Sequence, residues 1–311
     1  MNKSFTPPPS ASQLAFNREM AFDYGVAHEI APDVRRIVAN NPTAFTFKGT
    51  NSYIVGRGDV AVIDPGPDDK AHIDALLDAL QGERITQIII THTHRDHCDG
   101  VDMLKSRTGA TVMGYGPTER PRGVRTSSPS GKTFVDQNFS PDTALRDGDT
   151  VEGDGWKLDV IHTPGHAPDH LCFVLEEERS LFSGDNVLGV GTTVIPIGTG
   201  DLSEYMASLD RLLELEPTRI YPAHGPAIEE GSAKIREYIA HRNEREEQVL
   251  AALADERRTP MEVVREVYAA YPEKLFPAAA QSVTQHLLKL EREQRVSRVG
   301  DDPATATWSH C

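Results

Sequence analysis

Four side chains of the kinds that bind metal ions lie within six positions of one another. The sequence THTHRDHCDG at 91–100 contains His92, His94, Asp96 and His97, and it directly follows the apolar run at 85–90. In an extended segment His92 and His94 point to the same side, and a turn near Asp96 brings Asp96 and His97 toward a second ion. Because imidazole nitrogens and carboxylate oxygens are ligands for divalent metals, this motif predicts two adjacent metal positions.

Three more side chains of these kinds each follow another apolar run and a turn. They are His166 in HTPGHAPDH, Asp185 in LFSGD and His224 in IYPAHG. The glycines and prolines beside them allow tight backbone bends, which direct the side chains into one cleft at an edge of the predicted sheets. Together the seven residues make up two coordination spheres. We assign His92, His94 and His166 to one metal, Asp96, His97 and His224 to the other, and Asp185 to a bridge between them.

Two divalent ions about 3.5 to 4 Å apart would lower the pKa of a shared water toward neutrality. Metal-bound hydroxide would then be available as the nucleophile, so the reaction would need no serine or cysteine. The ions would polarise a carbonyl or a phosphoryl oxygen equally well, so the centre predicts hydrolysis without naming the ester. The leaving group distinguishes the two, because an alkoxide gains from a positioned proton donor and a thiolate does not.

The candidates for catalytic roles are Asp96 and His170. His170 lies four residues beyond His166 at the start of an apolar run. It is a candidate proton donor, and the alternative is a hydrogen bond that orients a metal ligand. Tyr205 is expected to be an ordinary core residue, with a place facing the cleft as the alternative. Cys98 is expected to pack and not to bind metal, since the ligand set is already complete.

Short β-rich runs punctuated by Gly, Pro and Asp predict the strands that position these residues. Two segments, 69–80 and 203–215, have the apolar spacing of amphipathic helices. The alternation predicts a layered α/β domain over 21–228, and the sequence of residues 1–20 predicts a loosely held arm. The predicted strands cover 34–38, 53–55, 60–64, 85–91, 157–161, 171–175, 180–183 and 219–221.

The composition changes toward helix after residue 228. Thr259, Pro260 and Glu262 form a capping box, in which the threonine caps a helix and the proline occupies its first position. Three helices followed by a hairpin predict a small winged-helix domain over 229–311. The predicted elements are helices that begin at Ser232 and after Thr259, a third helix over 278–294, and a β-hairpin within 296–308.

The composition also excludes some classes of protein. With 32 Lys and Arg against 47 Asp and Glu, the net charge is −15, so nucleic acid would be held by a few placed cations and by metal ions. No apolar run approaches the roughly 18 residues of a membrane span, and three cysteines are too few for a disulfide framework. A cytoplasmic setting without a membrane partner is therefore expected. Residues 116–140 predict a surface loop, or alternatively a cationic flap formed by Arg120, Arg122, Arg125 and Lys132.

The motif HxHxDH, followed by His, Asp and His in that order, resembles the signature of the metallo-β-lactamase superfamily. The resemblance implies an αββα sandwich over roughly 34–228, with a dinuclear and usually zinc site at its edge; iron and manganese are alternatives. The sequences FSGDNVLGVGTTV and HGPAIEEGSAKIREYIAHRNEREEQVL resemble the β-lactamase-like protein 2 subfamily, as does the tail. That subfamily implies a metal-dependent endoribonuclease acting on single-stranded RNA. Asp185 stands where the main penicillin-hydrolysing zinc enzymes carry Cys, which argues against antibiotic degradation.

The sequence leaves three functions open. The first is a dinuclear zinc hydrolase of single-stranded RNA, in which the winged-helix tail forms one wall of the cleft or a contact in a homodimer. The second keeps the metal site and changes the substrate to a small thioester or lactone, as in enzymes of the glyoxalase II type. The third is a metal sensor whose tail binds DNA or docks a partner, and the mixed charges of the third helix argue against it.

Overall fold

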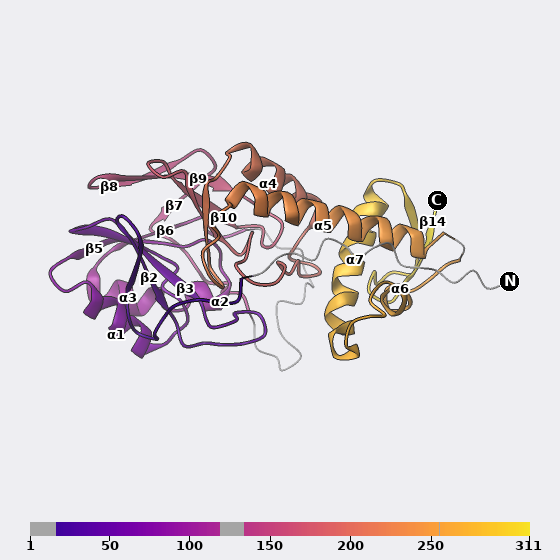
Figure 1. Cartoon of the computed structure of the whole chain (residues 1–311), viewed down its shortest axis with the longest axis horizontal. Coiled ribbons are helices and arrows are strands. Elements are labelled where there is room, and N and C mark those ends of the chain that lie inside the picture. The colour runs from indigo at the N-terminus through magenta and orange to yellow at the C-terminus, as the bar shows by residue number, and fades with distance from the viewer. Residues whose placement is uncertain (1–16, 119–133, 255) are drawn as a thin grey trace.

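Residues 17–118, 134–254 and 256–311 are described by the computed structural model. Most of the predicted arm, residues 1–16, lies outside these ranges, as do Arg120, Arg122, Arg125 and Lys132 of the predicted loop. The chain forms a layered body of sheets and helices with a smaller helical module beside it (Figure 1). Helix α5 (Gly231–Ala252) runs from the layered body into this module.

Two mixed sheets form the centre of the layered body. Within the described residues the first sheet has the order β1 to β7, antiparallel from β1 to β4 and parallel from β4 to β7. Its strands are β1 His28–Ala31, β2 Val34–Val38, β3 Asn51–Val55, β4 Asp59–Ile63, β5 Arg84–Ile89, β6 Thr111–Gly114 and β7 Thr143–Ala144. The second sheet has the order β12-β11-β10-β9-β8. Its strands are β8 Thr150–Gly153, β9 Trp156–His162, β10 Leu171–Leu175, β11 Ser180–Gly184 and β12 Arg219–Pro222.

Three apolar cores hold four layers together. Between the sheets, Tyr53 of β3 packs in one cluster with Phe173 of β10. Helices α1 (Lys70–Ala79) and α3 (Val101–Thr108) cover the outer face of the first sheet, and Leu76 lies in their core. Helix α4 (Leu202–Glu214) and the first half of α5 cover the second sheet. Because both faces of the sheets are covered, inner strands such as β4 and β10 are nearly continuous apolar runs. The predicted αββα sandwich is confirmed.

Strand direction brings the chemistry-bearing segments to one edge. Strands β9 and β11 are each antiparallel to β10, and β12 is parallel to β11, so β9, β11 and β12 end at the same edge of the second sheet. The segment after β5 joins this edge, since Thr91 O accepts from Leu171 N at 2.7 Å. A carboxylate oxygen of Asp169 also accepts from Thr93 N at 2.9 Å. The turns after these four strands therefore meet.

The C-terminal module has the parts of a winged helix. Thr259 Oγ1 accepts from Glu262 N at 3.4 Å and Glu262 Oε2 accepts from Thr259 N at 2.8 Å, so the capping box is present. Helix α5 serves both parts of the chain, because Tyr238 lies in the core of the sandwich and Val249 in the core of the module. The boundary predicted at 228/229 falls just before this shared helix. The other elements are α6 Pro260–Val267, a 3-10 turn Glu273–Leu275, α7 Phe276–Arg292, β13 Val296–Val299 and β14 Thr307–His310.

Some elements differ from the prediction. Helix α7 begins at Phe276 and not at 278, because Pro277 is compatible with a first helical turn, where its missing N–H costs no hydrogen bond. Two helices were not predicted: α2 (Arg95–Cys98) inside the ligand motif and α3 directly after it. Strands β1, β6, β7 and β8 were not predicted either, since each is short and partly exposed. Among the described residues, no helix combines the length and hydrophobicity needed to cross a membrane.

Replacing Trp308 by Ala should destabilise the winged-helix module. Trp308 is fully buried in the core of the module, and its Nε1 donates to Pro303 O at 3.2 Å. Removal of such a side chain costs about 3 to 5 kcal/mol. Urea unfolding should show this loss, and hydrogen exchange should place it in α6 and α7. Val299→Ala is the control, because Val299 is 60% exposed. Equal stability of the two variants would contradict the assignment of this core.

Candidate metal centre

The structure brings all seven predicted ligand residues together in two adjoining groups. His92, His94, His166 and Asp185 form the first group, and each contributes a ligand atom within 4.8 Å of the others. Asp96, His97 and His224 form the second group by the same measure. The side chains come from the segment after β5 and from the turns after β9, β11 and β12. The sequence placed the same three histidines in one group and Asp96, His97 and His224 in the other, and the binding of two ions stays a prediction.

Asp185 lies between the two groups. Its Oδ1 is 3.2 Å from His224 Nε2 and 3.7 Å from His97 Nε2. Its Oδ2 is 3.5 Å from His166 Nε2. One carboxylate oxygen thus faces each group, which is the arrangement that a bridging carboxylate needs.

Several buried atoms of these groups fit metal ligands. In the part of the chain that the structure describes, His92 Nε2, His97 Nε2 and Asp185 Oδ1 are buried and make no hydrogen bond. Buried polar atoms without partners are costly and rare, so they indicate a water or an ion. His94 Nδ1 also lies 3.0 Å from His166 Nε2. Nitrogens and carboxylate oxygens of this kind suit a divalent transition metal, and the residues present fit the group that the sequence implies.

The second ring nitrogen of each of four histidines is held by an acceptor. His92 Nδ1 bonds Thr91 Oγ1 at 3.0 Å, His97 Nδ1 bonds Asp64 Oδ2 at 2.8 Å, His166 Nδ1 bonds Val194 O at 2.6 Å, and His224 Nδ1 is 3.4 Å from Gly49 O. A carbonyl only accepts, so the proton of His166 is on Nδ1 and the lone pair of Nε2 faces the site. Thr91 Oγ1 donates to Asp64 at 2.7 Å, so it accepts from His92. These bonds orient the rings and select the tautomer that binds metal.

The charges of the site favour a cation. Burial lowers the pKa of His92 and His166 and that of His94 to about 3, so these rings are neutral ligands at neutral pH. Burial also lowers the pKa of His224, but the carboxylates of Asp185 and Asp96 outweigh it and raise the pKa to about 9. The second group therefore attracts positive charge, which a divalent ion would supply in place of protons.

His170 has both ring nitrogens engaged inside the protein. Its Nε2 accepts from Asp185 N at 3.1 Å, and its Nδ1 donates to Thr163 Oγ1 at 2.8 Å. The ring is fully buried, and burial holds its pKa well below the usual range. This geometry favours the predicted alternative, in which His170 orients Asp185, over the role of proton donor. Asp96 has the more exposed carboxylate of the site, with 31% of its side chain accessible against 12% for Asp185.

Tyr205 and Cys98 both lie in apolar cores of the sandwich, as expected from the sequence. Tyr205 is buried in the core between α4 and the second sheet, and its hydroxyl donates to Asn186 O at 2.7 Å. Cys98 is buried in the core beneath α1 and α3. Its Sγ lies near the carboxylates of Asp99 and Asp136, but burial raises the pKa of this thiol, and a thiol is a ligand only as thiolate.

Sequence reasoning missed two supports of the site. Asp64, directly after β4, accepts from Thr91 N, Thr91 Oγ1 and His97 Nδ1. The signal was present, since an acidic residue before Pro and Gly at the end of an apolar run is unusual in a plain turn. The contact of Val194 O with His166 has no such signal, because any residue can offer a carbonyl.

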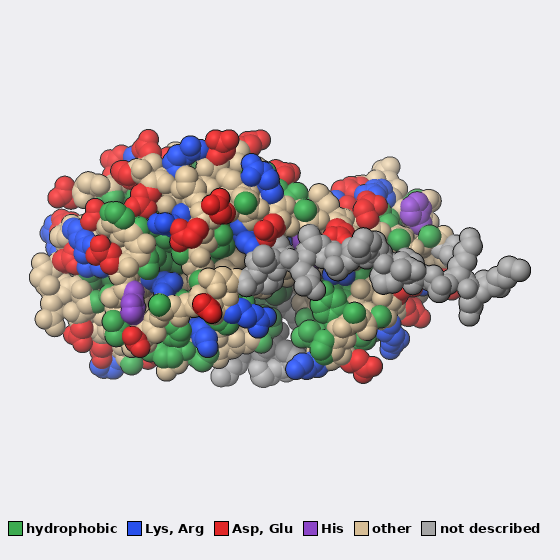
Figure 2. Space-filling view, viewed as in Figure 1, with side chains coloured by type: hydrophobic (Ala, Val, Ile, Leu, Met, Phe, Trp, Pro, Cys, Tyr) green, Lys and Arg blue, Asp and Glu red, His purple; other side chains and the backbone are tan. Residues whose placement is uncertain are grey.

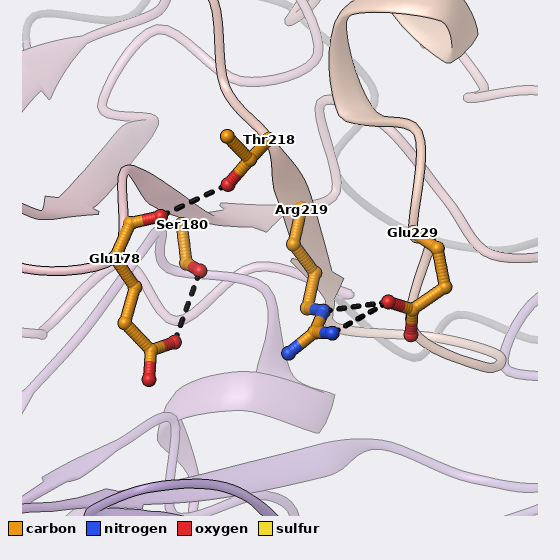
Figure 3. A pocket seen from close by; sticks show the side chains of 5 residues that line it. All are labelled: Glu178, Ser180, Thr218, Arg219 and Glu229. Atoms are coloured by element: carbon orange, nitrogen blue, oxygen red, sulfur yellow. Dashed lines mark hydrogen bonds and ion pairs between the residues drawn. The ribbon is translucent and has the colours of Figure 1, made fainter.

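A separate hollow of about 310 Å³ lies away from the metal centre (Figure 3). Its lining residues are Glu178, Ser180, Thr218, Arg219 and Glu229. They lie around the starts of β11 and β12, whereas the metal ligands follow the ends of these strands. Arg219 is paired with Glu229 at 2.6 Å, so the hollow offers no uncompensated cation to a ligand.

The four-layer sandwich and the paired ligand groups at its edge define a metal-dependent hydrolase. Residues 45–224 match the family model of the metallo-beta-lactamase superfamily, and residues 259–308 match the beta-lactamase associated winged helix domain. The chain belongs to the metallo-beta-lactamase superfamily, whose members are generally metal-dependent hydrolases. The resemblance carried by HxHxDH and by the tail is confirmed.

Similar proteins span nearly the whole chain. A protein of Drosophila melanogaster named beta-lactamase-like protein 2 homolog is 40% identical over 88% of this chain and 93% of its own. A protein of Aspergillus chevalieri named atrochrysone carboxyl ACP thioesterase is 36% identical over 86% of this chain and 84% of its own. The crystal structure of a metallo-beta-lactamase family protein from Thermus thermophilus is 26% identical, covers 91% of this chain and all of that one, and has a TM-score of 0.73.

Replacing Asp185 by Asn should remove metal from the centre. We expect about two divalent ions per chain in the unaltered protein, and fewer than two with most activity lost in the variant. The reason is that two adjacent cations repel each other, and the carboxylate between them offsets this repulsion. Elemental analysis of protein prepared without chelators measures the content, with Asp102→Asn on the exposed face of α3 as the control. One ion or none in the unaltered protein would contradict a dinuclear centre, and unchanged content in the variant would contradict the bridge.

Replacing Cys98 by Ser should leave the metal content unchanged, because the thiol packs and is not a ligand. In the native unaltered protein, a thiol reagent should react rapidly with one cysteine per chain, the exposed Cys311. Burial raises the pKa of Cys172 to about 12 and also raises that of Cys98, so both should react only after unfolding. Loss of an ion in the Cys98 variant would show that the ligand set is wrong.

Proposed function

We propose that this chain hydrolyses a thioester at a centre of two divalent cations, with zinc as the expected metal. The observation that carries the proposal is the engagement of His170, whose ring nitrogens bond Thr163 and the backbone of Asp185. Both nitrogens of the predicted donor for a leaving group are thereby occupied within the protein. A thiol has a pKa near 8.5, so a thiolate leaves without a proton, whereas an alkoxide gains from a donor.

The similar protein named atrochrysone carboxyl ACP thioesterase supports this choice of substrate class. It matches the chain through both the sandwich and the tail, since it covers 86% of the residues. The acyl group and the thiol carrier of the substrate are left open by this likeness. We therefore propose the bond that is cleaved and not a particular metabolite.

The residues of the site would have three roles, which are to hold the ions, to orient the ligands and to accept a proton. When bound, two divalent ions would supply Lewis acidity, which polarises the scissile carbonyl and lowers the pKa of water at the site. Asp185 would hold both ions, and His170 fixes its backbone. Asp96, with its more exposed carboxylate, would orient the attacking water through a hydrogen bond and accept its proton.

Cleavage of single-stranded RNA is the second candidate. The packing of the module supports it, because Gln285 and Arg292 of α7 contact the segment at 196–203, which follows Asp185 in the chain. A long polymer bound at the centre would then extend toward the module. The surface charge does not favour it. On the face in Figure 2, acidic and basic side chains are interspersed and form no continuous basic track among the described residues.

The sensor with a DNA-binding tail is not proposed. In winged-helix readers the recognition helix presents basic side chains to the groove. Here Lys289 pairs with Glu246 at 2.8 Å, Arg292 pairs with Asp201, and Arg295 lies 3.2 Å from Glu246. Helix α7 also packs against α4 of the sandwich. A homodimer and a cytoplasmic setting stay predictions.

A substrate panel on metal-characterised protein tests the proposal. It compares acyl-coenzyme A and S-lactoylglutathione with an alkyl ester of the same acyl group, a homoserine lactone, short single-stranded RNA and bis(p-nitrophenyl) phosphate. We expect the thioester to be hydrolysed about 100-fold faster than the matched alkyl ester, because general acid catalysis is worth at least that factor. Asp185→Asn protein is the control for contaminating esterase.

The same panel separates the candidates. RNA cleavage that exceeds all ester hydrolysis, and that disappears in the Asp185→Asn protein, would replace the thioester by the phosphodiester. Equal rates on the thioester and the alkyl ester would show that a proton donor acts after all. Deletion of the tail from residue 232 is a poor test, since it would remove Ile235 and Tyr238 from the core of the sandwich.

A further inference from the structure

The segment 186–200 connects the metal centre to α4. It begins directly after Asp185 and contains Val194, whose carbonyl accepts from His166 Nδ1 at 2.6 Å. The segment forms no strand or helix, so its backbone groups do not satisfy one another in a regular ladder. Buried carbonyls need partners from elsewhere. The position of this segment therefore determines where the ring of His166 points.

Side chains of the C-terminal helices supply several of these partners. Tyr238 of α5 donates from its hydroxyl to Gly191 O at 2.8 Å. Arg242, one turn further along α5, donates from Nη2 to Thr193 O at 2.5 Å. Gln285 of α7 donates from Nε2 to Pro196 O at 3.0 Å and to Gly200 O at 3.2 Å. Carbonyls on both sides of Val194 are thus held by the tail.

Arg242 and Gln285 are unusual residues to bury. Arg242 is 5% exposed and Gln285 is 2% exposed. The guanidinium of Arg242 also lies over the ring of Tyr205, 5.3 Å from its centroid. Desolvation of such groups is costly unless they form hydrogen bonds. Arg242 Nη2 and Gln285 Nε2 donate to carbonyls of the 186–200 segment. Their location between the two parts of the chain serves that segment and not the module itself.

We infer that Arg242 and Gln285 are positioning residues through which the C-terminal module holds the 186–200 segment and, through Val194, the ring of His166. The effect falls mainly on one metal position, because His166 belongs to the first ligand group. The second group is supported from the first sheet, where Asp64 holds His97 and Gly49 O lies near His224. This inference rests on the proposed metal centre and is independent of which ester is hydrolysed.

Three variants and two controls test it in the full-length protein. Arg242→Met and Gln285→Glu remove the donors, and Arg242→Lys keeps a cationic donor. Arg236→Met on α5 and Gln281→Glu on α7 are matched controls, since both residues are exposed on the same helices. Zinc affinity is measured by competition with a chelator, and the tautomer of His166 in metal-free protein is measured by ¹⁵N NMR. Circular dichroism checks folding.

We expect Arg242→Met and Gln285→Glu each to weaken one zinc position about 10- to 100-fold, the usual loss when a partner of a ligand is removed. The other position should keep its affinity. His166 should lose its predominant Nδ1–H tautomer in both variants, and Arg242→Lys should recover part of both effects. The two control variants should match the unaltered protein.

Two results would overturn the inference. One is unchanged zinc affinity and an unchanged His166 tautomer in folded Arg242→Met and Gln285→Glu proteins. The other is equal weakening of both zinc positions, which would indicate a general loss of structure. If Arg242→Met does not fold, Gln285→Glu and Arg242→Lys give the same readouts. A substrate panel that rejects thioesters would leave these measurements unaffected.

Discussion

The predicted metal centre depends on holding seven polar side chains in two groups, with one ligand atom of each within 4.8 Å of the others in its group. A histidine that binds metal must keep a bare lone pair on one nitrogen, and the ring is prevented from turning only by a bond at the other nitrogen. Asp64, Thr91 and Val194 provide these bonds from three different parts of the chain. The two sheets must therefore meet at one edge, since the segment after β5 of the first sheet and the turns after β9, β11 and β12 of the second sheet each carry only part of the ligand set.

The closeness of the layers limits which residues fit at the turns. Gly165 has a φ of 133°, and a Cβ there would lie 2.4 Å from the Cα of Tyr205 on α4. A Cβ at Gly184 would lie 2.7 Å from His170 Nε2, the atom that accepts from Asp185 N. Glycine at these positions lets the turns before His166 and Asp185 approach helix and ring closely. His166 and Asp185 are therefore positioned by close contacts that a larger residue at Gly165 or Gly184 would prevent.

The sequence was informative wherever the signal is local. HxHxDH after an apolar run and single ligands after three other runs were enough to select the residues that the structure gathers in two groups. The predicted helix over 69–80 corresponds to α1, which Asp69 caps through Ala71 N. The role of His170 could not be read in this way, because it depends on contacts with Thr163 and Asp185 that only the folded sheet creates. Helix α2 was not predicted because it is four residues long and consists largely of the polar residues of the ligand motif.

The role of the C-terminal module was also impossible to predict from local sequence signals. Its helices and hairpin were predictable from caps and apolar spacing, but the use of the module was not, because its contacts join residues 47 to 89 positions apart. Helix α7, the counterpart of a recognition helix, buries Thr284, Gln285 and His286, and its Lys289 and Arg292 are paired with Glu246 and Asp201. The irregular segment 186–200 beside the predicted metal centre needs hydrogen-bond donors for its buried carbonyls. The backbone N–H groups of the strands do not supply them, because these groups already bond neighbouring strands. A helical module packed across that segment supplies them, so its presence is explained by the geometry of the centre even where no nucleic acid is bound.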